Sequence, residues 1–136
     1  MDAEEELKVV KVVLIGESGV GKTAITNYFL HETFESDIPV TTSAAYASKT
    51  IKYNEAKDII KFDVWDTAGQ ENYRSLARIF YKDAGVAILV YDMTNLKSFE
   101  QIQNYWCSQI KEHAPKANKF TFYNISFLIY NYSISC

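Results

Sequence analysis

Apolar and polar positions follow two different periods in the first part of the chain. Residues 9–15 form an almost continuous β-branched run, which is typical of a strand buried on both faces. Residues 22–31 instead place Ile25, Tyr28 and Phe29 on one helical face. The pattern therefore predicts a buried strand that leads almost directly into a helix.

Three further strand-like runs follow. Residues 32–42 are polar and read as a loop. The runs at 44–53 and 59–65 flank a polar turn and predict a hairpin. Residues 86–91 are apolar and predict another buried strand.

A longer amphipathic helix is expected after this last strand. Ser98 and Gln101 have the spacing of a capping box, which predicts a helix start there. Apolar positions then recur at steps of three or four, at Phe99, Ile102, Trp106, Ile110 and His113. Strands that alternate with helices predict an α/β fold around a mainly parallel sheet with flanking helices.

The pattern changes after Pro115. Residues 120–136 form an uncharged run of seventeen residues, and the polar side chains within it make it a poor membrane span. Three interpretations stay open: a buried strand with a loose end, a translated non-coding or alternatively spliced tail, and a membrane-binding segment.

Composition narrows the class of protein. A hydrophobic content of 48% and a charged content of 23% exclude a disordered chain. The net charge of -3, without a basic run, predicts no nucleic-acid partner. Two cysteines cannot support a disulfide scaffold, so we expect a reducing compartment. The acidic residues 1–6 lack an apolar segment and predict no signal peptide.

Glycine marks the first candidate site. Three of the five glycines lie within six residues, in a segment that fits G-x-x-x-x-G-K-[ST] between the predicted strand and helix. Backbone N–H groups of such a loop can point at a polyphosphate, and the helix adds the positive end of its dipole. The alternative is a glycine-rich turn without a ligand. The candidate phosphate-binding residues are Glu17, Ser18, Gly19, Val20, Gly21, Lys22, Thr23 and Ala24.

Within this loop, two side chains carry the expected chemistry. Lys22 would supply a point charge to the β- and γ-phosphates, and the Thr23 hydroxyl could ligate Mg²⁺.

A second motif, at residues 66–70, follows the strand-like run that ends at Trp65. Asp66 stands where a carboxylate can hold Mg²⁺ through water, because ligands of open α/β sheets bind at the carboxyl ends of strands. Gly69 can bring its N–H to a γ-phosphate, and Gln70 can orient an attacking water. Both motifs together predict a nucleotide site.

These motifs resemble the Ras superfamily of small GTPases. The resemblance is strongest at residues 65–71, and the segments 71–76, 80–84 and 89–94 are similar to the Rab branch. Residues 41–46 are similar to the endosomal Rab form of switch I. The resemblance implies a P-loop NTPase-like fold with an incomplete C-terminal part. It divides the chain into an acidic N-terminal extension, a partial G domain and a divergent apolar tail, at residues 1–7, 8–116 and 117–136.

The resemblance also implies roles for single residues. Thr41 would sense the γ-phosphate and Mg²⁺, Phe34 would pack against guanine, and Gln70 would be the catalytic glutamine. Effectors, an exchange factor and a GTPase-activating protein would bind through residues 34–46 and 67–81. An aromatic triad would present these segments to effectors. The triad would be formed by Tyr46, Trp65 and Tyr81.

The implied function is a nucleotide switch of vesicle and endosomal traffic that binds GTP with Mg²⁺ and hydrolyses it slowly. Such a protein would be cytoplasmic and would reach endosomal membranes through its partners. The alternatives are a truncated pseudo-GTPase, with weak and unselective nucleotide binding, and a gene fragment without function.

Several positions depart from the family pattern. Thr42 and Ser43 stand where isoleucine and glycine are usual. The family continues with a fifth strand and an N-K-x-D motif, whereas this sequence has no Asp or Glu after Glu112. No C-terminal cysteine pair is present, so we expect no membrane attachment through one. We expect the segment from Phe120 to Tyr130 to pair beside the first strand, and the uncovered sheet face to favour aggregation or a partner.

Overall fold

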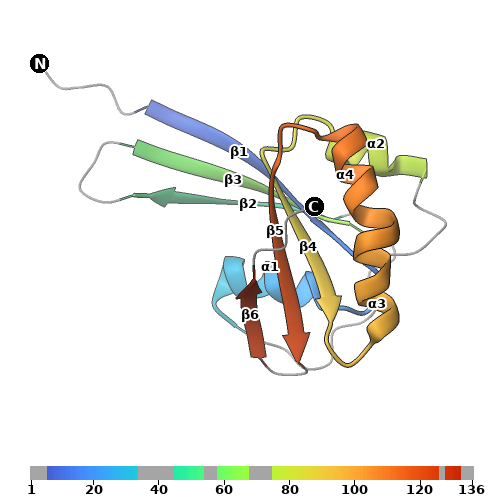
Figure 1. The fold of residues 1–136 in the computed structure, drawn as a ribbon. Helices are drawn as coiled ribbons and strands as arrows, with labels where there is room; N and C mark the ends of the chain where they lie inside the picture. The colour runs from blue at the N-terminus through green and yellow to red at the C-terminus, as the bar shows by residue number, and fades with distance from the viewer. Residues whose placement is uncertain (1–5, 34–44, 54–57, 68–74, 126–127, 133–136) are drawn as a thin grey trace, which may run out of the picture.

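The computed structural model describes residues 6–33, 45–53, 58–67, 75–125 and 128–132; for Ala77 and residues 120–132 it describes the backbone alone. The strands are β1 (Glu6–Ile15), β2 (Ala45–Lys52), β3 (Asp58–Asp66), β4 (Val86–Asp92), β5 (Asn118–Ile125) and β6 (Leu128–Tyr132). The helices are α1 (Lys22–His31), α2 (Ala77–Tyr81), α3 (Leu96–Gln101) and α4 (Cys107–His113), with a π-helical turn, η2 (Ile102–Trp106), between the last two (Figure 1).

All six strands belong to one sheet, in the order β2-β3-β1-β4-β5-β6. The four central strands, β3, β1, β4 and β5, are parallel neighbours. The two edge strands are antiparallel, β2 to β3 and β6 to β5. The predicted α/β fold with a mainly parallel sheet and flanking helices is therefore confirmed.

Helices cover both faces of the sheet (Figure 1). Successive side chains of a strand point to opposite faces, so β1 contributes to two separate clusters. Val13 and Ile15 pack in the cluster that includes Trp106 and Ile110, on the face of α3 and α4. Val12 and Leu14 pack with Val64 in a second cluster, and residues of α1 pack against this cluster.

Burial along β1 is uneven. The sequence predicts burial on both faces, and this holds for residues 12–15, which are all buried. Residues 6–9 are exposed, because the amino-terminal half of β1 projects with β2 and β3 beyond the helices (Figure 1).

The continuous helical segment formed by α3, η2 and α4 keeps its predicted apolar face but begins earlier than expected. Its N-cap is Asn95, so the prediction that a capping box starts the helix at Ser98 is wrong. Ser98 lies inside the first turn and is buried. Its hydroxyl donates to the Asn95 carbonyl oxygen at 2.7 Å and accepts from the Asp92 N–H at 3.0 Å. Ser98 therefore ties the helix start to the end of β4.

The apolar tail supplies the last two strands at one end of the sheet, β5 and the edge strand β6. β5 pairs with β4, with Val86 opposite Asn118 and Asp92 opposite Asn124. The expected pairing beside the first strand is therefore wrong, because β3 and β4 already occupy both edges of β1. Among the described residues, no helix has the length and apolar character needed to cross a membrane.

Candidate functional site

The candidate phosphate loop connects β1 to α1 at the carboxyl ends of the parallel strands. At Gly16 a β-carbon would lie 2.2 Å from the carbonyl oxygen of Val90, so only glycine fits between β1 and β4. Gly21 is the N-cap of α1 with φ of 103°, a left-handed conformation that glycine adopts without strain. The sequence thus folds locally into a tight loop against the helix start.

Lys22 reaches back across this loop. Its Nζ donates to the carbonyl oxygens of Gly16 at 3.0 Å and Glu17 at 2.7 Å, and the residue is only 5% exposed. Burial lowers the pKa of Lys22 to about 8, although the carboxylates of Asp66 and Glu17 oppose the shift. The loop therefore holds a nearly buried cation whose charge is only partly compensated.

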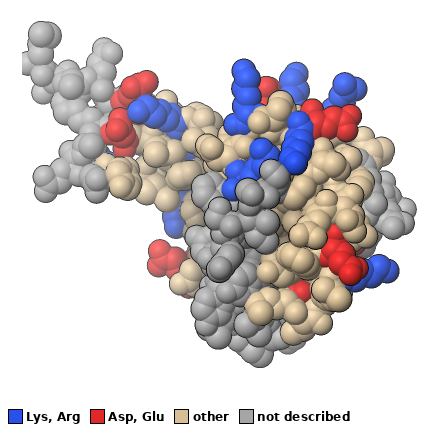
Figure 2. Space-filling model, viewed as in Figure 1, with Lys and Arg blue, Asp and Glu red and all other residues tan. Residues whose placement is uncertain are grey.

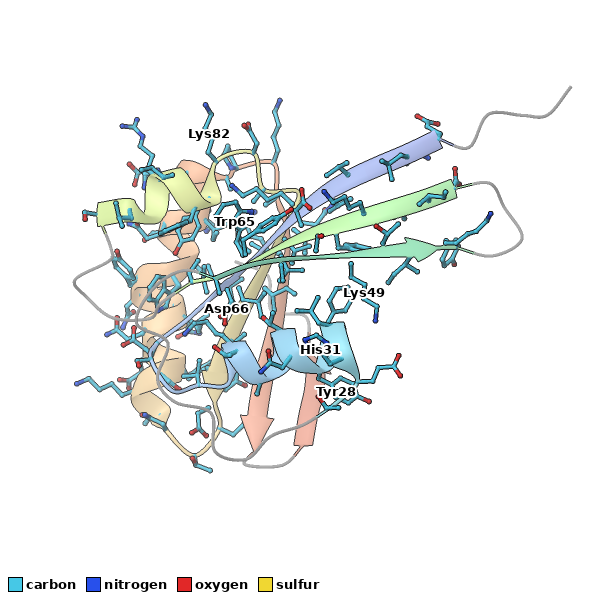
Figure 3. All side chains as sticks on the ribbon, turned by 180° about the vertical axis from the view of Figure 1, so that it is seen from behind. Tyr28, His31, Lys49, Trp65, Asp66 and Lys82 are labelled. Carbon is cyan, nitrogen blue, oxygen red and sulfur yellow. The ribbon has the colours of Figure 1, made fainter. Side chains whose placement is uncertain are left out.

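Asp66, at the end of β3, lies beside the amino end of α1 (Figure 3). Its Oδ2 accepts a hydrogen bond from the Thr23 hydroxyl at 2.5 Å, and the residue is 2% exposed. Its Oδ1 is buried and accepts no hydrogen bond within the described part of the chain. Burial raises the pKa of this carboxyl above its ordinary value, against the hydrogen bond from Thr23 and the charge of Lys22.

Thr67 fixes the position of this acidic end. Its buried hydroxyl donates to the carbonyl oxygen of Leu14 at 2.6 Å, which ties the end of β3 to β1 next to the loop. The carboxylate of Asp66 is therefore held in place by the sheet rather than by a free loop.

The residues at this point fit Mg²⁺. The buried, unpartnered Oδ1 of Asp66 and the Thr23 hydroxyl are hard oxygen donors, which this ion prefers. No group of three or more His, Cys, Asp and Glu side chains that could cage a metal occurs among the described residues. This donor set matches an ion that binds one or two protein oxygens and keeps water and substrate phosphates as its other ligands.

The remaining loop residues differ in exposure. Ser18 and Gly19 are exposed at the tip of the loop, Val20 is buried in the core, and Ala24 is half-buried on α1. The side chain of Glu17 accepts a hydrogen bond from Trp106 Nε1 at 3.0 Å. Sequence reasoning placed Trp106 on the apolar helix face, which is correct, but it missed this polar contact with the loop.

Four candidate residues lie outside the described residues: Phe34, Thr41, Gly69 and Gln70. Their roles stay predictions.

Two members of the predicted aromatic triad are in contact. The rings of Tyr46 and Trp65 lie 5.2 Å apart between centroids. The third ring is Phe80, 6.1 Å from Trp65, and the prediction of Tyr81 is wrong. Tyr81 is 2% exposed and packs in the core, 6.5 Å from the His113 ring. Adjacent residues of a helix point about 100° apart, so α2 can present only one of the two rings to Trp65.

Comparison with known proteins is consistent with this geometry. The profile of the Ras family matches residues 11–126. The chain is 38% identical over 109 residues to human "Ras-related protein Rab-22A", covering 80% of this chain and 55% of that protein. It is 41% identical over 107 residues to "Ras-related protein Rab-5B" of Plasmodium falciparum, covering 79% and 51%. It is 43% identical over 107 residues to "GTP-binding protein YPT52" of Saccharomyces cerevisiae, covering 74% and 45%. The chain spans about half the length of the curated relatives it matches.

Proposed function

This chain belongs to the Ras family, and from that premise we propose that it is a Rab-like switch that binds GTP and Mg²⁺ at the loop between β1 and α1. One observation carries the proposal. Lys22 is nearly buried, and Asp66 has a buried carboxylate oxygen that accepts no hydrogen bond from the described residues. Both side chains lie at the same end of the sheet. A nucleoside polyphosphate with its metal ion would satisfy both charges at once.

The loop residues have separate tasks in this proposal. The Lys22 ammonium, which rests on the carbonyl oxygens of Gly16 and Glu17, would turn to the β- and γ-phosphates. The backbone N–H groups of residues 19–23 and the amino end of α1 would cradle the phosphates. Thr23 and Asp66, with Thr41 from the predicted switch, would hold Mg²⁺, which supplies positive charge to the phosphate oxygens.

Hydrolysis would be slow in the isolated chain. We assign Gln70 the task of orienting the attacking water, as the family resemblance implies. No Lys or Arg occurs between His31 and Ser48, so that segment offers no arginine to the transition state. A rate on the order of 10⁻⁴ per second is expected, and an arginine from a partner would raise it by up to about 10⁵-fold.

We assign the switch to endosomal membrane traffic, and the resemblance of residues 41–46 to the endosomal Rab form of switch I supports this assignment. Effectors and regulators would bind through residues 34–46 and 67–81, and the contacting rings of Tyr46, Trp65 and Phe80 would form part of that surface. In this proposal residues 8–116 are the partial G domain, with an acidic extension at 1–7 and the divergent tail at 117–136.

A second candidate is a pseudo-GTPase with weak, unselective nucleotide binding. The observation that favours it lies in the tail, because β5 turns back into β6 and residues 118–136 contain no Asp or Glu. A carboxylate that pairs with two N–H donors of guanine is thus missing from this stretch. A binding site that pairs such N–H donors discriminates strongly between bases, and a site without the carboxylate loses this discrimination.

The experiment compares the wild-type chain with Lys22→Ala and Thr23→Asn in titrations with labelled GDP, GTP and ATP. We expect both substitutions to abolish Mg²⁺-dependent retention, because they remove the point charge and the metal-ligating hydroxyl. Lys97→Ala, on an exposed position of α3, is the matched control and should bind as the wild type does. Unchanged retention in Lys22→Ala would refute the site, and equal affinity for GTP and ATP would favour the second candidate.

A further inference from the structure

Glu17 is an acidic side chain in the loop that is proposed to bind the phosphates. Its main-chain oxygen accepts a hydrogen bond from Lys22 Nζ at 2.7 Å. Its carboxylate is close enough to raise the pKa of Lys22 by its charge. Once a polyphosphate lies in the loop, the same carboxylate is a neighbouring like charge, and its position then affects the affinity.

The structure holds that carboxylate from outside the loop. Trp106 Nε1 donates to Glu17 Oε1 at 3.0 Å, across 89 positions of sequence. Trp106 is 2% exposed and packs in the same core cluster as Ile102 and Ile110. That cluster lies on the sheet face opposite to the one against which α1 packs. The carboxylate is therefore directed toward the α4 side, whereas Lys22 and Thr23 belong to α1.

The helix has an irregular turn at the same place. The turn η2 ends at Trp106 and is closed by the Cys107 N–H, which donates to the carbonyl oxygen of Ile102, five residues earlier. Such wide turns change the direction of the side chains that follow, and they are frequent at functional sites. Here Ile102, Trp106 and Cys107 are all buried, so the indole is held in one orientation by the core.

We propose that Trp106 is a positioning residue of the phosphate loop, whose indole N–H holds the Glu17 carboxylate away from the position of the bound phosphates. The inference rests on the proposed nucleotide binding. Without the donor, the carboxylate can turn toward the phosphates and repel them. A hydrogen bond to a charged group that is lost in this way corresponds to a change in affinity of about tenfold or more.

The first test is a double-mutant cycle on GDP affinity. Trp106→Phe keeps an aromatic ring in the core and removes the N–H donor, and we expect it to weaken binding about tenfold. In a Glu17→Gln background the same substitution should cost less than about threefold, because no carboxylate is released. The effect in the Glu17 background should also shrink in 1 M salt, which screens charges beyond about 3 Å. Equal losses in both backgrounds would mean that Trp106 acts through packing alone and would overturn the proposal.

The second test needs no nucleotide. The chain has two tryptophans, so Trp65→Phe assigns the two indole N–H signals in a ¹⁵N–¹H NMR spectrum. Glu17→Leu should move the Trp106 signal and leave the Trp65 signal in place, whereas the control Ser18→Ala, at an exposed position, should move neither. An unmoved Trp106 signal in Glu17→Leu would overturn the proposal. A wild-type chain that binds no nucleotide would instead overturn the proposed function, and the positioning role with it, even if the signal moves.

Discussion

At the scale of single residues, the free site holds two groups in unfavourable environments. Lys22 and Asp66 are both nearly buried, and burial opposes the charged form of each. Asp66 also has an oxygen that no described residue satisfies. Such groups lower the stability of the free chain and gain most when a ligand of matching charge arrives. The two predictions at this scale follow from that conflict.

Asp66→Asn should stabilise the nucleotide-free chain and abolish its dependence on Mg²⁺. The amide keeps an acceptor for Thr23 but carries no charge to desolvate, so we expect a gain of about 1–3 kcal/mol at neutral pH. The fold raises the pKa of Asp66 above its ordinary value of 3.8. The charged carboxylate therefore destabilises the folded chain only as the pH rises through the raised pKa, and in acid the stability gained by Asp66→Asn should vanish.

The measurement is thermal or urea unfolding across pH, with Mg²⁺-dependent nucleotide retention measured in parallel. The matched control is Asp58→Asn, at an exposed position where the side chain pairs with Lys8 at 3.5 Å; its effect should stay within about 0.5 kcal/mol. An Asp66→Asn chain that is less stable at neutral pH, or that keeps its response to Mg²⁺, would contradict this view of the carboxylate.

Nucleotide affinity should fall as pH rises above 8. Free Lys22 has a pKa lowered from 10.5 to about 8, whereas a bound polyphosphate favours its charged form. Binding then requires proton uptake, and affinity falls by up to about tenfold per pH unit. The pH dependence of folding has the opposite direction. Between about pH 8 and pH 10.5 the unfolded chain holds a proton on Lys22 that the folded chain has lost, so the nucleotide-free protein becomes more stable as the pH rises.

Lys22→Arg provides the comparison, because a guanidinium stays charged over this range. GDP titrations from pH 7 to about pH 9.5 should show a steep decline for the wild type and a flat, weaker profile for the arginine variant. Parallel declines in both proteins would show that Lys22 is not the titrating group.

The residues of the phosphate loop were predictable from the sequence, but the side-chain contacts around the site were not. The close backbone approach requires glycine at position 16, and the positive φ favours it at position 21. Together with Lys22, the residue proposed to bind phosphate, they form a local motif that the sequence shows. The contact between Trp106 and Glu17 joins positions 89 residues apart and leaves no local pattern. The choice of Phe80 over Tyr81 depends on the rotation of a five-residue helix, which periodicity cannot resolve over so short a length.

At the scale of elements, the tail behaves as part of the sheet. β5 lies between β4 and β6, so the backbone groups of its residues have a strand on either side. Thr121 is opposite Leu89 on one neighbour and Tyr132 on the other. The sequence indicated a strand in this region from its apolar run, but not its partner. The order β2-β3-β1-β4 leaves free edges at β2 and at β4, and the tail pairs with β4.

Thr121→Pro tests this arrangement. Proline removes an N–H that faces a paired strand, so we expect a loss of about 1–3 kcal/mol in the free energy of unfolding. Thr121→Ala keeps the N–H and should cost less than about 1 kcal/mol. Urea unfolding of the two variants measures the difference. If proline and alanine have the same effect, residues 118–125 do not form an inner strand.

At the scale of the whole molecule, the cluster of positively charged surface side chains is separated from the site. Lys and Arg side chains gather at one end of the molecule, above α2 and α4 (Figure 2). Lys82 and Lys116 lie in turns that precede β4 and β5, at the amino ends of these strands and thus opposite the phosphate loop. The positive character of the candidate site therefore comes from Lys22 and the loop N–H groups rather than from surface lysines.

The face of the sheet under α1 is only partly filled. A cavity of about 750 Å³ lies between α1 and strands β1 to β4, and most of its lining side chains are apolar. Tyr28 lies on its rim and is 54% exposed. An open apolar cavity of this kind favours self-association.

Tyr28→Lys should reduce self-association of the chain without unfolding it, because it places a charge on the rim of the cavity and not in the core. Tyr53→Lys is the control: Tyr53 follows β2, away from the cavity, and is 61% exposed. Sedimentation at several protein concentrations measures both. If the two substitutions act alike, or neither acts, the cavity does not drive association.

The central claim, that this chain holds guanine nucleotide through its phosphate loop and Mg²⁺, is tested most directly by the nucleotide content of the purified wild-type protein. Extraction and chromatography of protein prepared in Mg²⁺ should yield guanine nucleotide, and prior chelation of Mg²⁺ should remove most of it. Protein that carries no nucleotide in Mg²⁺, and takes up none when GDP is added, would contradict the account.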